Sequence, residues 1–87
     1  MKKEENSYGI DELEFAIFCI ENVAIRLSVE PEKVYLALTE QTDILNGYII
    51  PSYDVLHTQG KDYIVDDIIS LMNEKGVKIW FYTMVLR

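Results

Sequence analysis

The sequence predicts an all-α fold: a compact bundle of three to four helices, with a short ordered loop before the last long helix and an apolar C-terminal tail. Apolar residues recur at three- and four-residue spacing in two long segments, which is the period of a helix buried along one face. The 87 residues are 49% hydrophobic and 26% charged, which is typical of one folded domain with a small core.

The first helix is expected over residues 11–27. Its inward face should consist of apolar residues at helical spacing: Leu13, Ile17, Ile20, Ala24 and Leu27. Ala16, Cys19 and Val23 widen this face, whereas Phe15 and Phe18 point to the other side. A helix that is apolar over most of its circumference is expected to be central in the bundle or shared with a partner.

The second helix is expected over residues 31–40, because Pro31 fits the first turn of a helix, where its missing amide hydrogen costs nothing. Val34, Tyr35 and Leu38 should form its buried side. The connection to the first helix is short, so the two helices should be neighbours.

A short third helical segment is expected to be capped by Thr42 or Asp43 and ended by Gly47, which tolerates a left-handed backbone. The residue before Pro51 should be extended, since a following proline disfavours helical backbone. Ser52 or Asp54 is then expected to cap a single turn. These signals predict an ordered loop between the third segment and the last helix.

The last long helix is expected over residues 61–75, with Gly76 as its stop. Its inward residues should be Ile64, Val65, Ile68, Leu71 and Met72. Asp66 and Asp67 are expected to be solvated surface. The chain then divides into a flexible N-terminus (1–8), a helical domain (9–76) and an apolar tail (77–87) whose β-branched and aromatic residues favour a strand or a docking arm.

Charge and cysteine content limit the classes of function. The net charge of −7 repels phosphate backbones and disfavours nucleic-acid binding, whereas it suits a basic protein partner. Cys19 is the single cysteine, which excludes an internal disulfide, and no run of apolar residues is long enough to cross a membrane. A cytoplasmic protein is therefore expected.

The most distinctive residues gather between the third segment and the last helix: Pro51, Tyr53, Asp54, His57, Thr58, Gln59 and Tyr63. Histidine is the side chain most often used as a general acid or base, and Asp54 lies three residues before His57 on the same side of a helical turn, as a general acid–base pair would require. A histidine bonded to loop carbonyls or to a carboxylate is the preferred interpretation, and no nucleophile is singled out. We expect no catalytic residue, metal site or cofactor, since the chain has one His and no glycine-rich phosphate loop.

Residues 12–76 resemble a small bacterial family of unknown function, and the Tyr-Asp-Val-Leu-His-Thr-Gln run at 53–59 is the most specific part of the match. The resemblance implies a short helical protein without established catalytic activity. Some members of that family are encoded beside proteins similar to ADP-ribosyltransferases, which implies an antitoxin or accessory role. The tail after Gly76 lies outside the resemblance.

Three hypotheses follow for the function. The first is a non-catalytic protein-interaction module that binds a basic, toxin-like partner through the 53–63 loop and the tail. The second is a self-associating homodimer in which His57 is structural; its interface candidates are Phe15, Phe18, Trp80, Phe81 and Tyr82. The third is a small enzyme that uses His57 and Asp54, which would need a pocket that a domain of this size hardly supplies alone.

Overall fold

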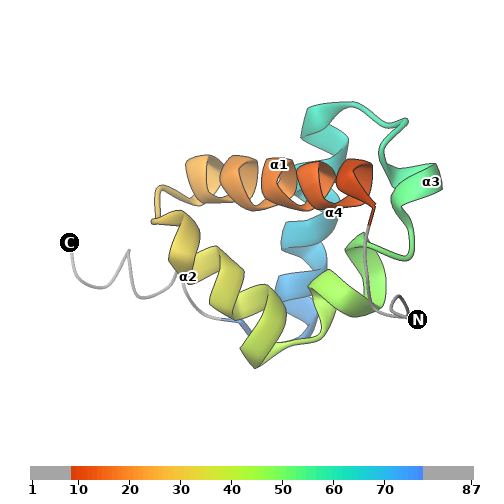
Figure 1. Cartoon of the computed structure of the whole chain (residues 1–87). Helices are drawn as coiled ribbons and strands as arrows, with labels where there is room; N and C mark the ends of the chain where they lie inside the picture. The colour runs from red at the N-terminus through yellow and green to blue at the C-terminus, as the bar shows by residue number, and fades with distance from the viewer. Residues whose placement is uncertain (1–8, 78–87) are drawn as a thin grey trace.

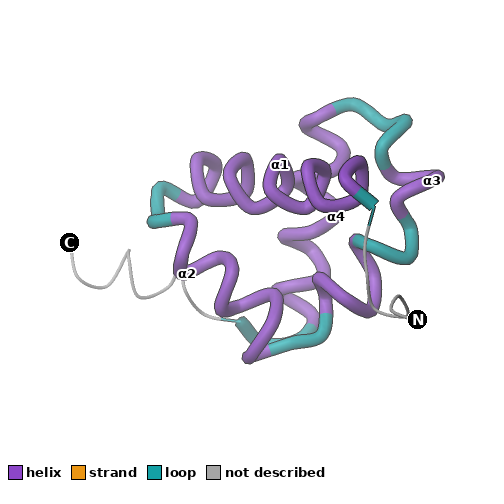
Figure 2. The backbone as a smooth tube through the Cα atoms, viewed as in Figure 1, coloured by secondary structure: helices purple, strands orange, loops and turns teal. Residues whose placement is uncertain are grey.

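The computed structural model describes residues 9–77, and every regular element in that range is a helix (Figure 1). The elements are α1 (Ile10–Leu27), α2 (Pro31–Leu36), the π-helical turn η1 (Ala37–Gln41), a second such turn η2 (Leu45–Ile49), α3 (Tyr53–Leu56) and α4 (Lys61–Glu74). Short loops join them (Figure 2). The predicted all-α fold is confirmed. The N-terminal segment 1–8 and the tail residues Trp80, Phe81 and Tyr82 lie outside the described residues.

A left-handed residue ends α1 and turns the chain toward α2. Ser28 has φ 59° and ψ 44°, so the amide of Val29 reaches back to the carbonyl of Ala24 at 3.0 Å. This bond pairs one of the carbonyl groups that a helix end leaves without a partner. Pro31 then begins α2 as its first residue, and α1 and α2 pack together as the short connection predicts.

The core lies where α1 contacts α2 and α4, and it is closed by the turns η1 and η2 (Figure 1). The buried residues of α1 are Phe15, Ala16, Cys19, Val23 and Ala24. Four of them are small, which lets neighbouring helices approach the α1 backbone closely. Val34, Leu38, Ile44, Ile49, Ile64, Ile68 and Met72 fill the other side of the core.

The predicted inward face of α1 was wrong in part. Leu13 and Ile17 are 49% and 50% exposed, whereas Phe15 is only 9% exposed. Because α1 is apolar around most of its circumference, its period alone did not decide which side would be covered. Packing decided it in favour of the side with Ala16 and Cys19.

Three further expectations, for Gly47, for the residue before Pro51 and for Tyr35, were wrong. The turn η2 continues through Gly47, and Ile50 before Pro51 is helical, with φ −69° and ψ −48°. The amide of Ile50 donates to the carbonyl of Leu45 at 3.0 Å, and Ile49 is fully buried. These contributions outweigh the steric preference for extended backbone before a proline. Tyr35, expected to be buried, is half exposed.

Thr42 links the two π-helical turns. Its hydroxyl donates to the carbonyl of Ala37 at 2.8 Å and accepts the amide of Ile44 at 3.2 Å. One side chain thus forms a hydrogen bond with a carbonyl of η1 and with an amide in the first turn of the next helical segment. Thr42 was one of the two residues predicted to cap this segment.

Gly76 ends the last helix as predicted. It has φ 81°, a conformation that glycine adopts without steric cost, and the amide of Val77 then donates to the carbonyl of Met72 at 2.9 Å. Val77 is 2% exposed and belongs to the core. The core therefore includes the first residue of the segment that the sequence assigned to the tail.

A surface ion pair joins α1 to α4. The guanidinium of Arg26 contacts Asp62 at 3.2 Å and Asp66 at 2.5 Å. All three side chains are substantially exposed, so water screens the attraction and the pairs contribute at most about 1 kcal/mol.

No helix within residues 9–77 is both long and apolar enough to span a bilayer.

Candidate functional site

The distinctive block at 51–63 folds as α3 and the turn that leads into α4. Leu56 anchors α3, since it is 3% exposed and its amide donates to the carbonyl of Ser52 at 2.8 Å. The Thr58 hydroxyl donates to the Val55 carbonyl at 2.7 Å and closes the turn. Neither Ser52 nor Asp54 caps α3 with its side chain.

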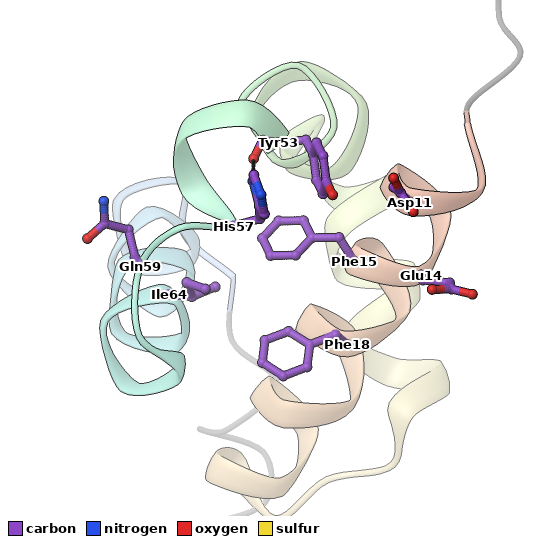
Figure 3. A pocket seen from close by; sticks show the side chains of 8 residues that line it. All are labelled: Asp11, Glu14, Phe15, Phe18, Tyr53, His57, Gln59 and Ile64. Carbon is purple, nitrogen blue, oxygen red and sulfur yellow. Dashed lines mark hydrogen bonds between the residues drawn. The ribbon is translucent and has the colours of Figure 1, made fainter.

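An open groove lies between α3, the start of α4 and the N-terminal half of α1 (Figure 3). Its volume is about 330 Å³, and it is lined by Asp11, Glu14, Phe15, Phe18, Tyr53, His57, Gln59 and Ile64. We call it the acidic aromatic groove. It brings three residues of the predicted block together with five that sequence reasoning did not connect to that block.

Four rings form a continuous series along this groove. The His57 ring stacks on Tyr53 with centroids 4.3 Å apart and planes 9° apart. Tyr53 meets Phe15 edge to face, with centroids 5.5 Å apart, and Phe15 lies 6.2 Å from Phe18. Such pairs contribute about 0.5–1.5 kcal/mol each beyond the area they bury. The series ties α3 to α1 and ends at Phe18, which is 37% exposed.

The imidazole of His57 bonds within its own turn. Its Nδ1 lies 2.6 Å from the carbonyl oxygen of Tyr53, and since a carbonyl only accepts, Nδ1 is the donor. The bond therefore goes to a backbone carbonyl of α3, neither to a loop carbonyl nor to Asp54. Asp54 and Thr58 line neither this groove nor the one on the other side of α3.

The surroundings of Tyr53 are electrically negative. Burial raises the pKa of its phenol, and the carboxylates of Asp11, Glu12, Asp54 and Glu14 raise the pKa further. Negative charge disfavours the phenolate, because like charges repel. The same field attracts a cation that enters the groove.

A second groove, of about 400 Å³, lies on the other side of α3. It is lined by Tyr48, Pro51, Ser52, Val55, Leu56, Gln59 and Tyr63, and we call it the tyrosine groove. The Tyr48 hydroxyl at its edge donates to a carboxylate oxygen of Asp67. Asp67, expected to be solvated surface, is instead half-buried and bonded to a tyrosine.

Residues 14–75 match the family described as "Protein of unknown function (DUF3791)". The chain belongs to this DUF3791 family. No curated protein and no solved structure matches it. The match includes α3, both grooves except Asp11, and the whole of α4, so membership joins the chain to a family whose own function is open.

The structure divides the predicted block between two surfaces. Tyr53 and His57 line the acidic aromatic groove, Pro51 and Tyr63 line the tyrosine groove, and Gln59 borders both. Sequence reasoning missed Asp11 and Glu14, which were assigned no role. A signal was present in their positions beside Phe15 and Phe18, since residues three and four apart share a helix face.

Within residues 9–77, no cluster of three or more His, Cys, Asp or Glu side chains is placed to hold a metal ion.

The Tyr48–Asp67 bond predicts a specific loss of stability in alkali. The bond to Asp67, with burial and the carboxylate charge, raises the Tyr48 pKa from 10.0 to about 12. A raised folded-state pKa gives stability that is complete below pH 10 and is lost as the pH rises through 12. Tyr48→Phe should therefore weaken the fall of the urea midpoint between pH 10 and 12, when wild type and variant are compared by circular dichroism.

Tyr35→Phe is the matched control, because Tyr35 is half exposed. Removing its hydroxyl should leave the pH dependence of the urea midpoint as it is in the wild type. The ultraviolet difference spectrum between wild type and Tyr48→Phe isolates the ionisation of Tyr48. A midpoint near 10 in that spectrum would show that the bond does not hold the proton in solution.

Proposed function

We propose that this protein is a non-catalytic protein-interaction module that binds its partner through the acidic aromatic groove. The observation that carries the proposal is the series of four aromatic rings ending at an open groove. Aromatic side chains are the residues most enriched among the strongest contacts of protein interfaces. Here they are held in place by one another, so a partner need not order them on binding.

The chemistry of the groove supports binding over catalysis. The Nδ1–H group of His57 donates to the backbone carbonyl of Tyr53. Asp54 is therefore not the group that orients the imidazole. Cys19 is fully buried, and burial raises the pKa of its thiol to about 12, so this thiol is a poor nucleophile. A histidine without an orienting carboxylate or a nearby nucleophile lacks the parts of a covalent catalyst.

The family resemblance of residues 12–76 gives the first candidate partner. We propose an ADP-ribosyltransferase-like protein encoded beside the gene for this chain, with the chain acting in the bacterial cytoplasm as its antitoxin or accessory protein. The net charge of −7 favours a partner with a basic surface, since complementary potentials speed association and disfavour other partners.

Binding of the purified neighbour-encoded protein tests the proposal. Tyr53→Ala should weaken the complex about tenfold or more, because truncating an anchor residue of an interface costs about 2 kcal/mol or more, and every 1.4 kcal/mol is a factor of ten. His57→Ala should weaken it in the same direction, since it uncovers one face of Tyr53. Calorimetry gives the dissociation constants, and circular dichroism checks that helicity is unchanged.

Tyr35→Ala is the matched control, since it removes a half-exposed tyrosine from α2, an element that lines neither groove. It should leave the dissociation constant unchanged. If Tyr53→Ala and Tyr35→Ala behave alike, the groove is not the binding surface.

Self-association is the second candidate. Ile10, Leu13 and Ile17 are 73%, 49% and 50% exposed at helical spacing on α1, which makes an apolar strip that a second copy would cover. Of the predicted interface residues on α1, Phe18 is accessible, whereas Phe15 is nearly buried. Light scattering of the pure chain distinguishes a dimer from a monomer, and Leu13→Gln should dissociate a dimer built on this strip.

A further inference from the structure

We propose that the acidic aromatic groove receives an arginine side chain of the partner protein. The guanidinium would lie against the exposed aromatic surface of the groove and be attracted by the negative charge of Asp11 and Glu14. This inference rests on the proposed function and specifies the chemistry that the groove recognises.

The size and floor of the groove fit one long side chain. At about 330 Å³, it is at the lower end of the range for small-molecule sites, which is about 300–1,000 Å³. Phe18 is 37% exposed and supplies apolar surface, against which the three methylenes of an arginine can be buried. The nearly buried Phe15 and Ile64 complete the apolar part of the lining. The aromatic series also offers ring surface at its ends, because His57 and Phe18 are both exposed.

The charge of the groove fits a cation. The described lining residues of the groove include Asp11 and Glu14 and no lysine or arginine. Glu12 and Asp54 lie near enough to Tyr53 to raise its pKa together with those two. The nearest basic residue by sequence, Lys61, lines a different hollow beside Asn22 and Arg26. A partner's cation would thus meet acidic groups and no competing positive side chain from the described lining.

Arginine fits this combination better than lysine. Its guanidinium is flat, weakly hydrated and able to stack on a ring while it donates two parallel hydrogen bonds to a carboxylate. An ammonium is a compact and strongly hydrated charge, so it gains less from an aromatic wall. The groove is therefore expected to prefer arginine over lysine.

A pair of capped tripeptides tests the inference on the full chain. Acetyl-Gly-Arg-Gly-amide should shift the NMR signals of His57, Phe18 and Ile64 in a saturable way, with a millimolar dissociation constant. The citrulline analogue has nearly the same shape without the charge, and it should bind at least about tenfold more weakly. Equal responses to the two peptides, or no saturable shift at these residues, would overturn the inference.

Variants test whether the carboxylates of Asp11 and Glu14 attract the arginine. The double variant with Asp11→Asn and Glu14→Gln should weaken arginine-peptide binding at least about fivefold and leave citrulline-peptide binding unchanged. Glu74→Gln is the matched control, since this exposed carboxylate lies at the far end of α4. A control that weakens binding as much as the double variant would show a response to net charge and overturn the assignment to the groove.

Two comparisons separate this inference from its premises. If the arginine peptide fails to bind while Tyr53→Ala still weakens the protein complex, the arginine assignment is wrong and the interaction module stands. The chain's own Arg87 is a competing source of the same group. An Arg87→Gln variant that binds the peptide about tenfold more tightly than wild type would assign the groove to the chain's own C-terminal segment and overturn the partner assignment.

Discussion

Leu38→Ala is expected to lower the free energy of unfolding by about 2–5 kcal/mol, because it removes a buried side chain and leaves a cavity. Leu38 is fully buried in η1, among the residues that close the core between α1, α2 and α4. A domain of this size loses about 4–8 °C of melting temperature for each kcal/mol. The variant should thus melt at least about 8 °C below wild type.

Leu36→Ala is the control for this prediction. Leu36 lies two residues earlier on the same helical stretch and is 44% exposed, so its truncation removes less apolar area from the protein interior. Its melting temperature should stay within about 4 °C of wild type. Equal losses for the two variants would mean that η1 does not pack as described, or that the exposed side of α2 is covered in solution.

The helix bounds could be predicted because local chemistry marks them. Pro31 begins α2 and Gly76 ends α4 as expected, since each residue satisfies a backbone requirement that does not depend on distant contacts. The apolar period of residues 64–72 likewise identified the buried face of α4. Local rules therefore predicted most of the architecture.

The misassigned face of α1 and the helical backbone before Pro51 have a common cause. Both depend on contacts made across the bundle, and such contacts override a weak local preference. Leu13 and Phe15 are both apolar, so only the position of the neighbouring helices determines which of them is buried. Ile50 is helical because the neighbouring Ile49 is buried and its own amide has a partner.

The candidate site was found from the sequence only in part. Tyr53, His57 and Gln59 attracted attention because they lie within one short block. Asp11 and Glu14 join them from the first helix, about forty residues earlier in the chain, and no spacing rule connects residues so far apart. The bond between Tyr48 and Asp67 was missed for the same reason.

Cys19 is expected to react with Ellman's reagent at least about a thousandfold more slowly in the native protein than in the urea-unfolded chain. Burial raises the pKa of the thiol from 9.0 to about 12, which lowers the thiolate fraction near neutral pH about a thousandfold. Full burial of the side chain adds a steric barrier. As Cys19 is the single cysteine, the absorbance change reports this site alone.

The same measurement tests whether Cys19 has any part in chemistry. A thiol that reacts only when the chain opens should label faster in Leu38→Ala, by about 30-fold or more if opening is global, since every 1.4 kcal/mol is a factor of ten in the open population. Cys19→Ser should give no signal. Rapid labelling of the native wild type would instead reveal an accessible, activated thiol, and that result would contradict the proposal of a non-catalytic module.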